Sequence, residues 1–235
     1  MSEISDHQRR IAAALRSAIA AQPRGEAVGA AGDMLAVAES IAAHGGLDLD
    51  DLRGRELSAS GGPGLLVLVL PFGLATPLDR PRLRRDAYRC AAATGADEGT
   101  ALVCVAAALV VADLMRFDPL TTAIRVRQSL LEDAPMALLD RLTLLDPDGA
   151  IAEAADDPSA ALQVALSALE WTRCSGVAAL LGRLGELGRG DRGTLAAALA
   201  GAACGICDVP LEGPVAERVD RAAEALAGLA GAALV

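Results

Sequence analysis

The chain has 235 residues, of which 53% are hydrophobic but only 2% aromatic, and its formal net charge is −10. This length allows one substantial core, while the strongly acidic balance removes the attraction to phosphate that dominates nucleic-acid binding and so excludes nucleic acid as a partner. All 21 basic residues are arginine, a bias typical of a GC-rich bacterial genome, so arginine by itself indicates no particular ligand.

The composition also bears on the compartment. The longest apolar run, residues 101–112, is too short to span a bilayer and is flanked by Glu98 and Asp113. Residues 1–10 are polar and do not resemble a secretory signal. Five cysteines, an odd number, predict free thiols in a reducing compartment. We therefore expect a cytoplasmic protein that does not bind membranes.

Alanine- and leucine-rich periodic segments predict helices along the whole chain. In chain order they cover residues 6–22, 32–44, 65–70, 79–94, 99–116, 119–133, 135–144, 159–171, 173–187, 194–206 and 214–233. The apolar run at 65–70 alone fits either a buried strand or a short buried helix, and no other segment has a convincing strand pattern. The prediction is an all-α fold, a compact single-domain orthogonal bundle of roughly ten helices over residues 1–235.

The stretch from 187 to 210 is a glycine-rich loop, an alanine-rich helix and a proline. It resembles the C-terminal signature of the ADP-ribosylglycohydrolase family, which includes the dinitrogenase-reductase-activating glycohydrolases and the J1 crystallins. There a Gly-Gly-Asp-x-Asp-Thr loop precedes the helix. Asp191 and Thr194 match the first Asp and the Thr, whereas Gly193 replaces the second Asp. The resemblance runs from about Arg10 to about Pro210, and it favours a helix at 65–70.

The resemblance implies a site in which carboxylates and hydroxyls hold two Mg²⁺ ions near ADP-ribose. The first of the family's metal loops, Thr-Asp-Asp-Thr, aligns with Val-Gly-Ala-Ala at residues 28–31, which offers no oxygen ligand. Asp33, about one helical turn later, is the nearest carboxylate, and Glu26 is a loose match to an early family Glu. Since Mg²⁺ requires hard oxygen ligands, we expect no cofactor, or at most one weakly bound Mg²⁺ on Asp191 and Thr194.

A simpler interpretation, which we favour, is that Asp191 caps the helix that follows it. Two other clusters have a similar choice of readings. Cys204-Gly-Ile-Cys207 fits a redox pair or half a metal site, but packing is favoured because no second cysteine pair or histidine cluster accompanies it. The arginines between residues 80 and 89 could bind phosphate, but a surface balanced by Asp79 and Asp86 is favoured. Cys90, Cys104 and Cys174 lie on apolar helix faces and are expected in the core.

Three functions remain open. The first is a degenerate ADP-ribosylglycohydrolase-like pseudoenzyme that does not cleave ADP-ribosyl-arginine and acts as a binding or scaffold protein, with Gly190, Asp191 and Thr194 as its ligand-binding residues. The second is a hydrolase or biosynthetic tailoring enzyme of altered chemistry, with Asp191, Asp33, Glu26 or Asp97 as acid or base. The third is a helical protein-interaction module. The partner, a small molecule or a protein, is not identified by the sequence.

Overall fold

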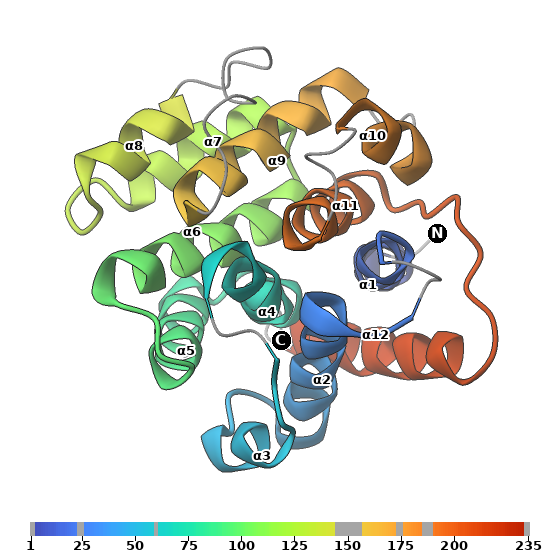
Figure 1. The fold of residues 1–235 in the computed structure, drawn as a ribbon. Coiled ribbons are helices and arrows are strands. Elements are labelled where there is room, and N and C mark those ends of the chain that lie inside the picture. Colours follow the sequence, from blue (N-terminus) through green and yellow to red (C-terminus); the bar gives the residue numbers. More distant parts are fainter. Residues whose placement is uncertain are drawn as a thin grey trace.

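The computed structural model describes residues 3–22, 26–58, 61–143, 157–172, 176–184 and 190–232. Within these ranges the chain forms helices and no strand (Figure 1), which confirms the all-α prediction. The helices are α1 (Glu3–Ala20), α2 (Gly29–His44), α3 (Leu49–Gly54), α4 (Gly62–Ala75), α5 (Arg80–Ala93), α6 (Glu98–Leu114), α7 (Pro119–Ser129), α8 (Met136–Thr143), α9 (Pro158–Thr172), α10 (Val177–Leu184), α11 (Asp191–Cys204) and α12 (Pro214–Ala232). None of the described helices combines the length and apolarity needed to cross a bilayer.

The structure differs from the predicted helices at several places. The short helix α3 was not predicted, and it is closed at its start by Asp48, which accepts hydrogen bonds from the backbone N–H groups of Asp50 and Asp51. Helix α2 begins at Gly29, three residues earlier than expected. The apolar run at 65–70 is helical as predicted, but α4 continues through Pro71 to Ala75.

The core is built around helices that are apolar on every side. All residues of α4 from Gly64 to Ala75 are buried, as are those of α6 from Val103 to Leu114 and those of α11 from Gly193 to Ala202. A helix that is hydrophobic all round belongs in the interior, and these three are surrounded by the other helices (Figure 1). Helix α1 packs beside α11, and α2 packs beside α4. Both α1 and α2 therefore have one end near the start of α11.

Small residues let the central helices approach closely. A Cβ atom placed on Gly201 of α11 would lie 2.3 Å from the carbonyl oxygen of Ala13 in α1, and one on Gly73 of α4 would lie 2.1 Å from that of Ala108 in α6. Both positions therefore require glycine, because the obstructing atoms belong to rigid helix backbone. Arg10 of α1 fixes the same α1–α11 contact by donating to the carbonyl oxygens of Ala202, at 3.1 Å, and of Ala203.

Candidate functional site

The residues that resemble the family's metal loop form the first turn of α11. Gly190 precedes the helix with φ +66° and ψ −147°, a conformation open to glycine and strained for other residues. The helix therefore begins at Asp191 and not at Thr194, and no side chain accepts a hydrogen bond from its first N–H groups at the N-cap position. The prediction that Asp191 caps this helix is wrong, because the backbone turn at Gly190 places Asp191 inside the first turn.

Thr194 is fully buried and its hydroxyl makes two hydrogen bonds. Its Oγ1 donates to the carbonyl oxygen of Gly190 at 3.1 Å and accepts from Nε2 of Gln22 at 2.6 Å. Gln22 lies just after the end of α1. Thr194 therefore ties the start of α11 to the end of α1, and its hydroxyl is engaged in holding the fold.

The carboxylate of Asp33 on α2 is also buried and hydrogen-bonded. Its two oxygens accept from the backbone N–H of Ser58 at 3.0 and 3.1 Å, and one of them accepts from the Ser58 hydroxyl at 2.8 Å. Ser58 lies between α3 and α4. Asp33 thus fixes the path of the chain toward α4.

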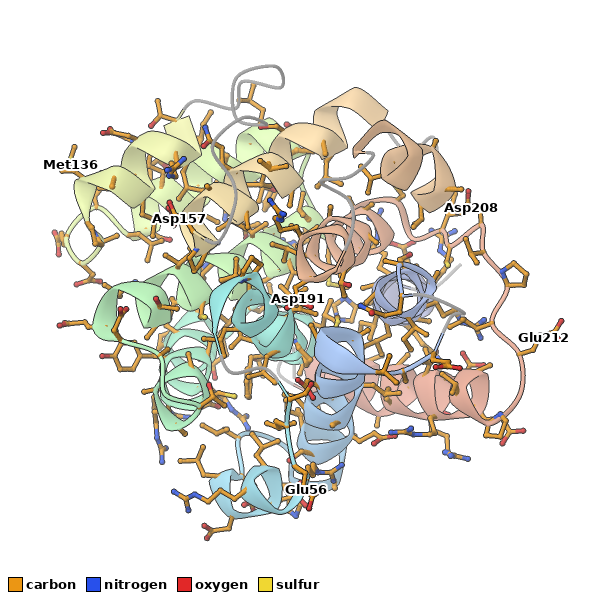
Figure 2. The ribbon with its side chains drawn as sticks, in the orientation of Figure 1. Glu56, Met136, Asp157, Asp191, Asp208 and Glu212 are labelled. Atoms are coloured by element: carbon orange, nitrogen blue, oxygen red, sulfur yellow. The ribbon has the colours of Figure 1, made fainter. Side chains whose placement is uncertain are left out.

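The structure brings Asp33 and Asp191 together from opposite ends of the sequence. Asp191 lies where α11 meets the ends of α2 and α4, near the centre of the molecule in this view (Figure 2). Although Asp191 keeps an exposed surface, neighbouring atoms displace part of the water around its carboxyl, which raises its pKa, and the Asp33 carboxylate raises that pKa further. We call the group formed by Asp33, Asp191, Thr194, Gln22 and Ser58 the carboxylate site.

The other two acid–base candidates have different surroundings. Asp97 is the N-cap of α6 and accepts from the backbone N–H of Thr100 at 2.7 Å, and this hydrogen bond lowers its pKa. Glu26 is exposed in the connection between α1 and α2. Among the described residues, the Asp33 carboxylate raises the pKa of Asp191, so of the four candidates the structure couples these two.

Oxygen atoms of the carboxylate site already take part in hydrogen bonds within the protein. Both oxygens of Asp33 accept hydrogen bonds from Ser58, and the hydroxyl of Thr194 is bonded to Gly190 and Gln22. In the described part of the chain, no three His, Cys, Asp or Glu side chains are grouped as a metal site would need. Asp191 and Asp33 are the two carboxylates of the carboxylate site, and two divalent ions need several carboxylates to offset their charge.

Four of the five arginines on α5 contact carboxylates or carbonyl groups. Arg80 donates to both oxygens of Asp113 at 2.6 Å, and Arg85 pairs with Asp86 at 2.9 Å. Arg82 contacts Asp86 at 3.6 Å, and Arg84 donates to the carbonyl oxygen of Ser129 at 3.0 Å and pairs with Asp133. These arginines bind the protein itself, as the interpretation of a charge-balanced surface expects.

The cysteines divide into two groups. Cys90 and Cys104 are free and buried, and burial raises the pKa of each thiol to about 12, so neither is a reactive thiolate. Cys207 is free, whereas Cys204 is disulfide-bonded. The two sulfurs of the Cys-x-x-Cys motif are therefore not bonded to each other, and the expectation that the cysteines are free thiols fails at Cys204. Cys174 lies outside the described residues.

Sequence analysis missed two members of the carboxylate site. Neither Gln22, at the end of the predicted helix 6–22, nor Ser58 was among the candidate residues. Each is a common polar residue in a connection, and nothing in the local pattern shows that its partner lies 172 or 25 residues away along the chain. Only the approach of α11 to the ends of α1 and α2 identifies these residues, and that approach is a property of the tertiary structure.

Comparison with known proteins supports the resemblance at the level of fold. The sequence matches no family model, and no curated protein is similar enough to count as a match. Among solved structures, a chain described as "ADP-ribosylglycohydrolase-related protein complex" aligns with a TM-score of 0.68 and 21% identity, covering 96% of this chain and 99% of that chain. This protein therefore has the fold of an ADP-ribosylglycohydrolase-related protein, over almost its whole length.

Proposed function

We propose that this chain is a degenerate ADP-ribosylglycohydrolase-like protein, without a working two-metal site, that acts as a binding or scaffold protein. The observation that carries the proposal is the state of the oxygen ligands at the start of α11. Asp33 and Thr194 use their oxygens in hydrogen bonds that hold α2, α11 and the flanking connections. Thr194, which matches the family's Thr, and Asp33, the carboxylate nearest the first aligned loop, thus serve the fold in this chain.

The description of the related structure agrees with a role in assembly. That protein is named as part of a complex, and its aligned region spans nearly all of both chains. A shared fold does not carry chemistry with it, because function depends on the residues of the site. We therefore propose that this chain binds a partner through the common fold and does not hydrolyse ADP-ribosyl-arginine.

A second candidate function rests on the pair of carboxylates. Burial and the neighbouring Asp33 carboxylate raise the pKa of Asp191, while Asp33 accepts hydrogen bonds from Ser58. Two carboxyl groups whose environments differ in this way suit a general acid and its charged partner. In this alternative the chain is a hydrolase or tailoring enzyme in which Asp191 donates the proton and Asp33 is its carboxylate partner.

Two measurements on the full chain separate these proposals. In the first, ADP-ribosylated arginine is incubated with the protein and Mg²⁺; the pseudoenzyme releases no more ADP-ribose than buffer does. In the second, the melting temperature is measured with ADP-ribose, with Mg²⁺ and with both, because a ligand that binds only the folded state raises it. We expect any rise caused by ADP-ribose to be the same with and without Mg²⁺.

The variant Asp191→Asn, with Asp97→Asn as the matched control, distinguishes the outcomes. Magnesium-dependent release of ADP-ribose would contradict the pseudoenzyme proposal. Turnover without Mg²⁺ that is lost in Asp191→Asn and kept in Asp97→Asn would favour the altered enzyme. No thermal shift with any addition would remove ADP-ribose as the ligand and leave the scaffold role.

A further inference from the structure

Exposed apolar side chains are concentrated on one short stretch of the surface. Of the eight large apolar residues that are exposed in the described part of the chain, four lie between residues 120 and 136. They are Leu120, Ile124, Leu131 and Met136, which are between 48% and 64% exposed. Scattered apolar residues are normal on a protein surface, but a cluster indicates an interaction site. We call these four residues the α7–α8 face.

The helical register places these side chains together. Leu120 and Ile124 are four residues apart on α7, so they project from the same side of the helix. Leu131 follows seven residues later, close to two helical turns, and the chain continues to turn there because the N–H of Ala134 donates to the carbonyl oxygen of Leu130 at 2.9 Å. Met136, the first residue of α8, points outward at the rim of the molecule (Figure 2).

The opposite side of α7 faces the core, where Ala123, Val126 and Leu130 are completely buried. Helix α7 is thus apolar on two sides, which core packing alone does not require.

The α7–α8 face is held rigidly by contacts behind it. Arg84 of α5 donates to the carbonyl oxygen of Ser129 at 3.0 Å and pairs with Asp133. Arg127 donates to the carbonyl oxygen of Leu139 at 3.3 Å, which links α7 to α8. A surface fixed in this way loses little conformational entropy when it binds a partner.

Local charge indicates what kind of partner fits. The segment from 116 to 141 contains four arginines and four carboxylates, so it carries none of the net charge of −10. Two copies of this acidic chain repel each other over most of their surfaces, and this segment is where they can approach without that cost. Arg116, which precedes Leu120 in the chain, and Glu132, which follows Leu131, are both exposed. In the described residues no ion pair is recorded for either, although Arg116 lies 5.6 Å from the ring centroid of Phe117.

From these observations we propose that the α7–α8 face is a two-fold contact between two copies of this chain. In such a contact the same patch is used by both copies. The two α7 helices run antiparallel, so Leu120 and Ile124 of one copy pack against the α7–α8 face of the other. Arg116 of each copy then lies beside Glu132 of its neighbour. The arrangement buries the four apolar side chains and pairs two charges twice.

The size of the face sets the expected strength. A stable interface covers about 800 Å² on each partner, and four half-exposed side chains supply the centre of such an area but not all of it. The dimer is therefore weak, with a dissociation constant of about 10–100 μM.

The oligomeric state of the full chain tests the proposal. Sedimentation velocity is run from about 5 μM to about 500 μM, a range that brackets this dissociation constant. We expect the wild type to change from monomer to dimer across it. Ile124→Glu weakens the dimer about tenfold or more, because it places a charge at the centre of the contact. Ile206→Glu is the matched control, since Ile206 is 53% exposed, much like Ile124 at 48%, but lies at the end of α11; it leaves the dimer unchanged.

Charge reversal tests the two-fold geometry. Arg116→Glu and Glu132→Arg each weaken the dimer, because each variant brings two like charges together twice. The double variant restores it, and an equimolar mixture of the two single variants forms a mixed dimer. Two results would overturn the proposal. In the first, the wild type stays monomeric throughout the concentration range, which would leave the face to a different protein. In the second, Ile124→Glu and Ile206→Glu affect the dimer equally. All variants are checked for an unchanged melting temperature in the monomeric range.

Discussion

The helices near the carboxylate site and those of the α5–α7 region differ in their N-cap residues. On one side, α5, α6 and α7 each begin after an aspartate, Asp79, Asp97 or Asp118, whose carboxylate accepts a backbone N–H of the first turn. On the side of the carboxylate site, α2, α4 and α11 begin after Val28, Gly61 or Gly190, and none of these N-caps makes a side-chain hydrogen bond. An aspartate cap is typically worth about 1 kcal/mol, so the site side forgoes a stabilisation that the other side uses.

This difference coincides with the resemblance. The starts of α2 and α11 are the two stretches that align with the family's metal loops, and they contain neither the full set of ligands nor caps. On the site side, α11 packs closely on α1 around Gly201. On the capped side, Asp113 forms ion pairs with Arg80 and Arg125, at 2.6 and 3.2 Å. The following three predictions test this contrast.

The largest effect is expected at the α1–α11 contact. Gly201→Ala places a Cβ against backbone atoms of Ala13 and Ala14, so the helices must separate, and we expect the free energy of unfolding to fall by about 3 kcal/mol. Urea denaturation followed by circular dichroism measures it. The control is Gly228→Ala in α12, where nothing lies within 4 Å of the new Cβ; it should stabilise by about 0.5–1 kcal/mol. Equal effects at the two glycines would refute the close packing of α11 on α1.

A smaller loss is expected at the buried ion pair. Asp113 is 5% exposed at its side chain, while Arg80 and Arg125 are 28% and 42% exposed. Asp113→Ala leaves two arginines without their partner, but water can reach them, so we expect a loss of about 2 kcal/mol rather than the 3–5 kcal/mol of a fully buried pair. In the control, Asp50→Ala, both members of the Asp50–Arg53 pair are largely exposed, and the same urea titration should show no measurable change.

The smallest effect concerns the charge of Asp191. Its pKa is raised in the folded state, so its ionised form destabilises the fold at neutral pH, and this cost disappears as the pH falls through the folded pKa toward the unfolded value. Asp191→Asn should therefore melt at a higher temperature than the wild type near pH 7, with a difference that shrinks toward about pH 4.

The variant Asp97→Asn is expected to change the melting temperature in the opposite direction. The pKa of Asp97 is lowered by its hydrogen bond with Thr100, so its ionised form stabilises the fold above the unfolded pKa and that contribution is lost in acid. This variant should melt no higher than the wild type near pH 7. If both variants shift the melting temperature in the same direction, the electrostatic contrast between the two sides is wrong.

The helical class and most helix positions could be predicted from the sequence, because they depend on local pattern. The apolar runs in α4 and α6 have no polar face, so they had to be buried, and the prolines at 119 and 135 mark helix starts that the structure places at Pro119 and Met136. Helix ends were less certain. The start of α11 was misplaced by three residues because Gly190 adopts φ +66° and ψ −147°, which lets the helix begin at Asp191.

The sequence alone determined that the chain is helical, that it resembles the ADP-ribosylglycohydrolases, and that the aligned first metal loop lacks ligands, since these facts depend on residue identity. Only the tertiary structure decided which polar groups are engaged. It joined Thr194 to Gln22, Asp33 to Ser58, and Asp191 to the field of Asp33. The physical reason is that hydrogen bonding and charge coupling depend on separation in space, and helices distant in sequence meet only when the core between them is packed.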